Sequence, residues 1–428
     1  MVRFIHAADI HLDSPLKGLA RYEGAPVEQL RNATRNAFSA LVTRAIEEQV
    51  DFVVIAGDLY DGDWRDYNTG LFFCREMGRL HEAGIPVYVL YGNHDAQSEI
   101  TRQLRLPGNV HEFPGKAPGS FVLEHAGVAL HGQSFRTAAV HENLAVGYPA
   151  AIPGFFNIGV LHTALDGHAA HDPYAPCSLD ELAARGYDYW ALGHVHEHAI
   201  RRTAPWVVYP GNLQGRHIRE TGERGAVLVS VDGSRVKVER LAVDVLRWHH
   251  LEIDGAGAVC LEDVLEAIHR GLAGILPRNE GRAAAVRVTV RGSCRAHGEL
   301  FGLENQLRAE VLAQANALAG ADLWVEKVCV ETSPALSPEE LMARSDALAD
   351  LQDLLAHVGG DAELIEGLTE ELQELIGKCP REVLERVPAL EAVRTGRVRE
   401  LVDSVAPSLL ARLACERVAE RGPASRGD

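Results

Sequence analysis

Five short polar clusters contain the residue types that bind divalent metal ions and transfer protons. They combine aspartate, histidine and asparagine, and none of them contains cysteine. Imidazole, carboxylate and amide oxygen ligands suit manganese, iron or zinc, and the missing thiolates argue against a structural zinc site. In chain order the clusters are Asp9-Ile-His11, Gly57-Asp58-Leu-Tyr-Asp61, Gly92-Asn93-His94-Asp95, His162 and Gly193-His194-Val-His196.

Each cluster directly follows a short apolar run that is typical of a β-strand. The runs cover residues 2–8, 51–56, 85–91, 155–161 and 187–192. Side chains beyond the carboxyl ends of strands in an open α/β sheet gather in one crevice, so distant clusters can meet there. Any single cluster has a simpler explanation as a turn or as a hydrogen-bonded histidine. Their combination, in this order, favours one shared metal cleft.

The elements that position these clusters predict an α/β fold. Up to residue 243, apolar runs alternate with helical patterns such as 29–49, and antiparallel strands are expected in the 120s, 200s, 220s and 230s. A strand-helix-strand-helix-strand pattern follows, at 247–253, 261–272, 285–290, 303–318 and 323–330. We therefore expect a catalytic domain over 1–243, a small α+β domain over 246–332 and a helical region over 337–420.

Charge and cysteine usage narrow the function classes. The chain has 42 Lys and Arg residues against 60 Asp and Glu residues, a net charge of −18, which argues against coating nucleic acid by bulk positive charge. A polyanionic substrate would need bound cations in the cleft. The seven scattered cysteines and the missing signal-peptide and membrane-span patterns predict a soluble protein of the reducing cytoplasm.

The ordered motifs D-x-H, G-D-x-x-D, G-N-H-D, H and G-H-x-H resemble the calcineurin-like metallophosphoesterase family over residues 1–243. The resemblance implies a β-sandwich flanked by helices, with a small α+β capping domain and a helical C-terminal region after it. It also implies two metal ions about 3.5–4 Å apart that share a hydroxide, which attacks phosphorus. The implied ligands are Asp9, His11, Asp58 and His196 for the first ion, and Asp58, Asn93, His162 and His194 for the second.

The same resemblance assigns roles around the metals. Asp58 would bridge the two ions, and His94 would be the catalytic histidine that assists the leaving oxygen. Asp95 would hold the His94 ring in the useful tautomer. Asp61 stands where the nuclease subunits of eukaryotic and archaeal break-repair complexes have histidine, which separates this chain from them.

Two further segments resemble the SbcD and YhaO type of DNA repair exonucleases within the family. They are Phe4-Ile-His-Ala-Ala-Asp-Ile-His-Leu-Asp-Ser-Pro-Leu16 and Tyr209-Pro-Gly-Asn-Leu-Gln-Gly-Arg-His217. The implied function is a manganese-dependent DNA exonuclease, with single-strand endonuclease activity as a second possibility and Fe²⁺ or Zn²⁺ as alternative metals. The implied partners are DNA, an SMC-like ATPase of the SbcC/YhaN type and a second copy in a homodimer. The helix from Ser337, with its leucine stripe, would dock the ATPase or pack internally.

Four arginines near the last ligand motif fit either phosphate positioning or a solvated edge: Arg201, Arg202, Arg216 and Arg219. The remaining histidines His6, His131, His168 and His171 are expected to be structural or to lie on the surface. Two rival functions stay open. One is hydrolysis of a small-molecule or nucleotide phosphoester, which the negative charge favours, and the other is a non-catalytic scaffold, which the complete set of ligands disfavours.

Overall fold

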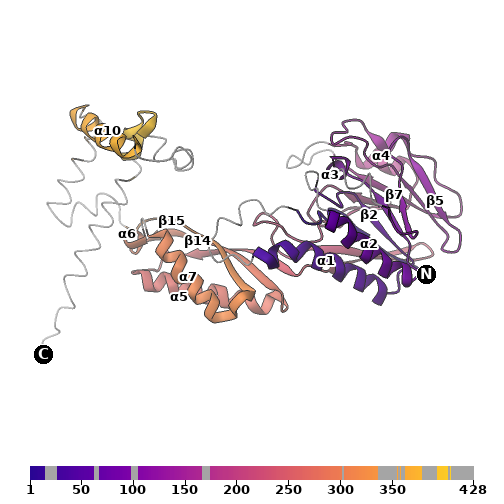
Figure 1. Cartoon of the computed structure of the whole chain (residues 1–428), viewed down its shortest axis with the longest axis horizontal. Helices are drawn as coiled ribbons and strands as arrows, with labels where there is room; N and C mark the ends of the chain where they lie inside the picture. Colours follow the sequence, from indigo (N-terminus) through magenta and orange to yellow (C-terminus); the bar gives the residue numbers. More distant parts are fainter. Residues whose placement is uncertain are drawn as a thin grey trace. The chain divides into compact units, whose positions relative to one another are not determined.

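The computed structural model describes residues 1–14, 27–61, 67–97, 105–165, 174–300, 303–335, 354, 357, 362–377, 393–402 and 405 (Figure 1). Contacts divide the chain into two compact units, Met1–His249 with Asn279–Ala285, and His250–Arg278 with Val286–Asp428. The predicted leucine stripe of residues 341, 348, 351 and 355 lies outside the described residues. The division into three domains remains a prediction.

Two six-stranded sheets build the first unit, with strand orders β12-β11-β1-β2-β3-β4 and β5-β6-β7-β8-β10-β9. Both sheets mix parallel and antiparallel strands: β1 to β4 of the first sheet and β6, β7, β8 and β10 of the second are parallel, and β11, β12, β5 and β9 pair antiparallel with their neighbours. The first sheet contains β1 (Val2–Ala7), β2 (Phe52–Ala56), β3 (Val87–Leu90), β4 (Val110–Glu112), β11 (Gly225–Asp232) and β12 (Arg235–Ala242). The second contains β5 (Gly119–Leu123), β6 (Val128–Gly132), β7 (Phe156–His162), β8 (Tyr189–Gly193), β9 (Ala199–Thr203) and β10 (Trp206–Tyr209).

Alternation along the strands sorts their side chains into two cores. Phe4 and Val54 pack with Ile158 in the layer between the sheets. Ile5 and Val53 point the other way and pack on helices α1 (Val27–Glu47) and α2 (Tyr67–Glu82). Helix α4 (Leu179–Ala184) contributes to a third core on the outer side of the second sheet. The predicted class, β-sheets flanked by helices, is confirmed.

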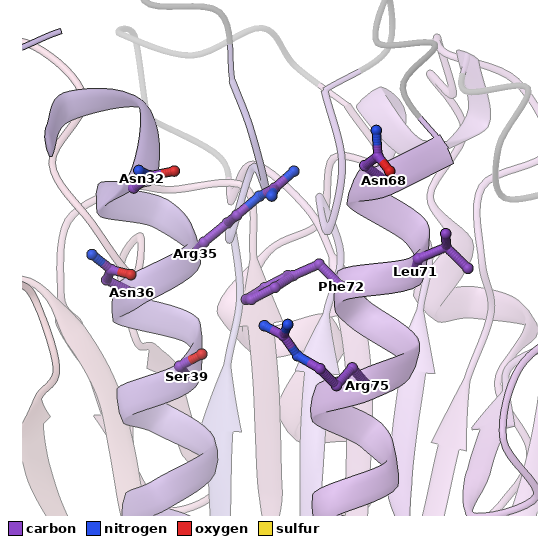
Figure 2. Close-up of a pocket in the computed structure, with 8 residues that line it drawn as sticks. All are labelled: Asn32, Arg35, Asn36, Ser39, Asn68, Leu71, Phe72 and Arg75. Atoms are coloured by element: carbon purple, nitrogen blue, oxygen red, sulfur yellow. The ribbon is translucent and has the colours of Figure 1, made fainter. Parts of the chain in front are cut away.

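Helices α1 and α2 also hold the loop that follows the first polar cluster. The guanidinium groups of Arg35 and Arg75 lie 5.3 and 5.1 Å from the centre of the Phe72 ring (Figure 2). Asp13 accepts hydrogen bonds from the guanidinium of Arg35 and, at 2.5 Å, from the hydroxyl of Thr69. One carboxylate thus ties both helices to the segment that begins at Asp9.

The second unit contains most of the three-stranded sheet β13-β14-β15, whose first two strands begin within the first unit, and the helices of the predicted α+β pattern. Its elements are β13 (Leu246–Asp254), α5 (Leu261–Ile275), β14 (Ala283–Cys294), α6 (His297–Leu300), α7 (Glu304–Ala319), β15 (Leu323–Pro334) and α10 (Ala362–Gly377). The apolar side of α5 buries Val264, Ile268 and Leu272. Among the described residues of both units, no helix is long and apolar enough to span a membrane.

Alanine substitutions at two glycines are expected to change the free energy of unfolding in opposite directions. A Cβ on Gly159 would lie 2.4 Å from the buried Trp190 ring, so Gly159→Ala is expected to destabilise the protein by about 1–3 kcal/mol. A Cβ on Gly78, within α2, would meet no atom within 4 Å, so Gly78→Ala is expected to stabilise by about 0.5–1 kcal/mol. Urea unfolding of both variants checks this, and equal midpoints would contradict the packing of β7 on β8.

Candidate metal centre

The polar clusters meet because their strands end at one edge of the two sheets. Asp9 follows β1 and Asp58 follows β2, and these loops are joined by backbone hydrogen bonds from Asp9 N to Gly57 O and from His11 N to Asp58 O, both 3.0 Å. His162 ends β7, beside the end of β8. The first sheet therefore supplies carboxylates at the same place where the second sheet supplies imidazoles.

Three glycines in these motifs are required by close contact. A Cβ on Gly57 would lie 2.2 Å from Nδ1 of His162, and one on Gly92 would lie 2.4 Å from Oδ1 of Asp58. A Cβ on Gly193 would lie 1.9 Å from the carbonyl oxygen of Ala56. Real Cβ atoms do not approach so closely, so these positions must be glycine for the strand ends to meet.

The ligand loops have strained backbone. Asp9, His11, Asp58 and His194 have φ angles of 50°, 47°, 53° and 95°, in the left-handed region that residues with a Cβ seldom occupy. Each such residue costs on the order of 1–3 kcal/mol and persists only where surrounding contacts fix it. Strain concentrated on the predicted ligands is typical of a functional site.

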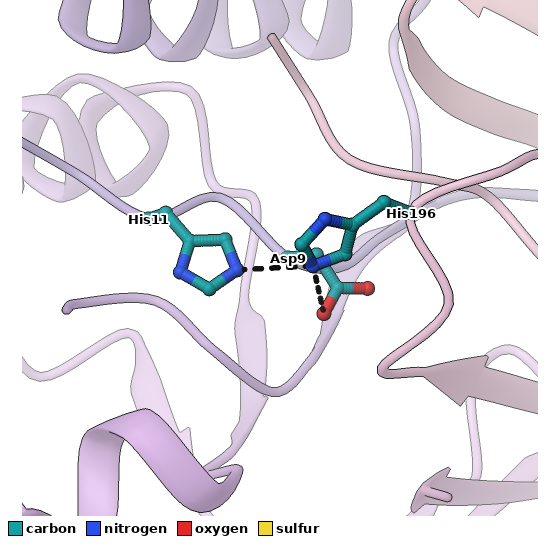
Figure 3. Close-up of side chains that lie close together, drawn as sticks. All are labelled: Asp9, His11 and His196. Carbon is teal, nitrogen blue, oxygen red and sulfur yellow. Dashed lines mark hydrogen bonds and ion pairs between the residues drawn. The ribbon is translucent and has the colours of Figure 1, made fainter. Parts of the chain in front are cut away.

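The first cluster contains Asp9, His11 and His196 (Figure 3). The Nε2 atoms of His11 and His196 face each other at 3.3 Å, and Nε2 of His196 lies 3.9 Å from a carboxylate oxygen of Asp9. The opposite ring nitrogens contact carboxylates, Nδ1 of His11 with Asp61 at 2.9 Å and Nδ1 of His196 with Glu220 at 2.7 Å. Each Nδ1 therefore carries the proton, and two Nε2 lone pairs point at one space beside a carboxylate, which suits a metal cation.

The second cluster contains Asp58, Asn93 and His162. Nδ1 of His162 lies 2.9 Å from the carbonyl oxygen of Ala56, which can only accept, so Nδ1 donates and Nε2 is the nitrogen left for a metal, which would displace its proton. Nε2 then faces Oδ2 of Asp58 at 3.4 Å and Oδ1 of Asn93 at 3.0 Å. Burial disfavours a charged His162 ring, but Asp58 and Asp9 outweigh it and raise its pKa to about 9. This cluster therefore attracts positive charge.

The structure brings together the donors predicted for both metals. Groups with metal-binding spacing are Asp9 with His11 and His196, Asp9 with Asp58 and His162, and His11 with Asp58 and His94. Asp58 lies within 3.8 Å of His11 and 3.4 Å of His162, the central position expected of a bridging ligand. The ring of His194 lies 5.2 Å from the His162 ring, and its backbone N–H donates to Asp9. The donor set fits two divalent ions.

A carboxylate beside the His94 ring is that of Asp61, whereas the sequence predicted Asp95 for this position. Nδ1 of His94 lies 3.1 Å from Oδ1 of Asp61, and this hydrogen bond raises the pKa of His94. The buried Asp95 carboxylate instead accepts backbone N–H groups of Leu59, Tyr60 and Gly92 at 2.8–3.1 Å. Asp95 thus joins the loop after β2 to the loop after β3, and Asp61 orients the His94 ring.

Of the four predicted arginines, only Arg216 contacts the cluster among the described residues. Its guanidinium lies 3.4 Å from Nδ1 of His196, 3.4 Å from Glu220 and 3.7 Å from Asp61. Arg202 instead pairs with Asp180 at 3.1 Å. The two exposed residues Arg201 and Arg219 make no polar contact with the ligands in the part of the chain that is described.

Glu220 is a site residue that the sequence did not indicate. It is buried, and its carboxylate binds His196, the Asn212 amide at 3.0 Å and the backbone N–H of Arg216 at 2.7 Å. Burial opposes its ionisation, but His196 and Arg216 hold its pKa below the usual range. The nearest sequence signal was its place shortly after the Pro-Gly-Asn segment.

Two of the remaining histidines are structural, as expected. Buried His6 contacts the Tyr189 hydroxyl at 3.0 Å, and buried His131 lies between Ser120 at 2.7 Å and Asn157 at 3.1 Å. Burial lowers the pKa of His6 to about 3, which keeps it neutral. Positions 168 and 171 lie outside the described residues.

Two known protein families match parts of this chain, and several individual proteins are similar to it. The family "Calcineurin-like phosphoesterase" matches residues 2–198, and "Metallophosphoesterase YhaO, middle domain" matches residues 248–333. An uncharacterized metallophosphoesterase YhaO of Bacillus subtilis is 37% identical over 295 residues, 68% of this chain and 72% of that protein. The DNA double-strand break repair protein Mre11 of Aeropyrum pernix is 28% identical over 298 residues, 64% and 68% of the two chains. A dimetal phosphatase from Danio rerio shares 12% identity and a TM-score of 0.36 over 56% of this chain and 96% of its own.

The central position of Asp58 predicts that one substitution removes both metals. Asp58→Ala deletes the carboxylate that lies near ligands of both clusters, so the purified variant is expected to hold no stoichiometric metal and to have lost activity. Elemental analysis measures the metal content, with Asp180→Ala, an exposed carboxylate on α4, as control. Two metals retained in Asp58→Ala would contradict the bridging role.

Proposed function

Because the chain belongs to the calcineurin-like metallophosphoesterase family and is thus a metal-dependent phosphodiesterase, we propose that its substrate is DNA. The proposed activity is that of an exonuclease in DNA repair, with endonuclease activity on single strands. Relatives named as DNA double-strand break repair proteins support the choice of substrate. The observation that carries the chemistry is the pair of facing acceptor clusters, which suits two adjacent cations.

The residues of the two clusters would hold two divalent ions, with Mn²⁺ as the proposed metal. Oxygen and imidazole ligands without thiolate suit a hard to borderline ion. When bound, such ions lower the pKa of a water and neutralise charge that develops on phosphate oxygens. The proposed sets are Asp9, His11, Asp58 and His196, and Asp58, Asn93, His162 and His194.

His94 and Arg216 are the groups of this chain that we assign to the substrate. The His94 side chain is 41% exposed beside the clusters, so its ring can reach a leaving oxygen, and its backbone N–H is fixed by a 3.0 Å hydrogen bond to Asp58. Asp61 favours the cationic ring, which can donate a proton or hydrogen bond. Arg216 adds a cation near Asp61 that can pair with a phosphate oxygen.

The proposed partners are DNA, an SMC-like ATPase of the SbcC/YhaN type that docks on the C-terminal helices, and a second copy of the chain. The proposed compartment is the cytoplasm. Free cysteines at positions 74, 177, 260, 294 and 329 are compatible with a reducing compartment. Copurification with the ATPase tests the proposed partnership with that protein.

Metal removal tests the proposed activity. After chelation the protein is expected to be inactive, and Mn²⁺ is expected to restore hydrolysis better than Mg²⁺ or Ca²⁺. Duplex DNA, single-stranded DNA and bis(4-nitrophenyl) phosphate should be assayed side by side. Hydrolysis of the small diester without hydrolysis of DNA would support the small-molecule alternative, which the net charge of −18 favours. Full activity in excess chelator would refute metal dependence.

A second test separates the chemistry of His94 from metal binding. His94→Ala is expected to retain both metals and bind DNA, but to lose about 10²–10⁴-fold in kcat. Asp61→Asn should cause a smaller loss, because the ring keeps its place but loses the carboxylate that orients it. The double variant should be about as slow as His94→Ala, since Asp61 then has no catalytic ring to orient. Multiplicative losses, or metal depletion in His94→Ala, would contradict these roles.

A further inference from the structure

A cavity lies beside the loop that follows β6, in addition to the pocket between α1 and α2 that Figure 2 shows. It encloses about 640 Å³, and its walls include Gly115, the loop residues 133–144 and their polar side chains. Arg136, Thr137, His141 and Glu142 are exposed on this loop. None of them belongs to the metal clusters, so the cavity is separate from the ligands themselves.

Ring contacts connect this cavity to the second metal cluster. The Phe135 ring lies 5.6 Å from the ring of His162, and the Phe135 N–H donates to Tyr91 O, just before the Gly92-Asn93 turn, at 2.8 Å. The exposed His141 ring lies 5.9 Å from the Tyr174 ring, which in turn lies 5.6 Å from the His194 ring. These contacts place the loop that carries Arg136 and His141 next to two predicted ligands of the second metal.

The arginine of this cavity differs from those of the pocket between α1 and α2 in having no acidic partner among the described residues. There, Arg35 is bound to Asp13, and Arg75 lies 3.5 Å from Glu76. Arg136 makes no ion pair or hydrogen bond with any described residue. Glu142 shares the cavity but is not within ion-pair distance of Arg136. In a chain of net charge −18, Arg136 is thus a cation beside the metal centre that an anion can pair with.

We propose that this cavity binds the nucleotide adjacent to the cleaved phosphodiester, which deepens the proposed DNA phosphodiesterase function and rests on it. Arg136 pairs with the neighbouring phosphate. The exposed His141 ring, which lies beside Tyr174, offers an aromatic face to the base, a contact that any base can make. Glu142 repels phosphate from its own wall and so confines the anion to the Arg136 side. The cavity selects a polynucleotide over a small phosphoester.

Steady-state hydrolysis of a single-stranded oligonucleotide and of bis(4-nitrophenyl) phosphate by the Mn²⁺-loaded full chain tests this proposal. For Arg136→Ala we expect KM for the oligonucleotide to rise about tenfold, with kcat unchanged, because one charged phosphate contact is lost equally from ground and transition states. The slope of log KM against log salt should fall by about 0.7, the value for one phosphate on single-stranded DNA. Both constants for the small diester should stay unchanged.

The control variant is Arg235→Ala. Arg235 is exposed in the β11–β12 hairpin, opposite Asp232, and Val2 at the start of β1 pairs with the neighbouring Val231, at the opposite end of β1 from Asp9. This variant should leave both substrates unaffected. An unchanged oligonucleotide KM in Arg136→Ala, or equal losses on both substrates, would overturn the cavity proposal while the DNA phosphodiesterase proposal stands. If the unaltered protein cleaves only the small diester, the DNA proposal fails, and the cavity proposal fails with it.

Discussion

The carbonyl oxygen of Ala56 is the point at which the two sheets are fitted together. It accepts the Nδ1 proton of His162 at 2.9 Å, and it lies where a Cβ of Gly193 would otherwise be, at 1.9 Å. The first contact fixes the tautomer that leaves Nε2 of His162 available to a metal. The second allows β8 to end close enough to β2 for His194 to reach Asp9. One backbone atom thereby joins the carboxylates of one sheet to the imidazoles of the other.

The charges around the site bear on the proposal that this acidic chain acts on DNA. Burial raises the pKa of Asp9, whereas the imidazoles around Asp58 overcome its burial and hold its pKa below the usual range. The outer nitrogens of His11 and His196 are bound by Asp61 and Glu220, so negative charge surrounds the rings as well. Two divalent ions would reverse the sign of the field locally. The net charge of the chain therefore does not decide its substrate, since the sign of the cleft follows its metal content.

Much of this site is predictable from sequence because it depends on short-range pattern. Apolar runs that end in Asp, His or Asn indicate strand ends, and strand ends of parallel sheets converge. Glu220 could not be predicted, because its contact with His196 depends on how two loops pack 24 residues apart. The contact between His94 and Asp61 was not predicted either, because Asp95 adjoins His94 in sequence whereas Asp61 does not. Within the helical turn α3 (Asn93–Gln97), successive side chains point about 100° apart, so Asp95 faces the backbone after β2 and His94 faces Asp61.

Hydrogen bonds behind the ligands also hold the strained backbone of the ligand loops in place. Asp9, His11, Asp58 and His194 each occupy left-handed backbone at a cost, and nothing in their own sequence would hold them there. The backbone hydrogen bonds between the Asp9 and Asp58 loops, and the three bonds that Asp95 accepts, supply the restraint. That restraint therefore comes from neighbouring loops rather than from within each loop. The donor geometry is thus a collective property of the strand ends, and Asp95 contributes to it by accepting the backbone N–H groups of Leu59, Tyr60 and Gly92.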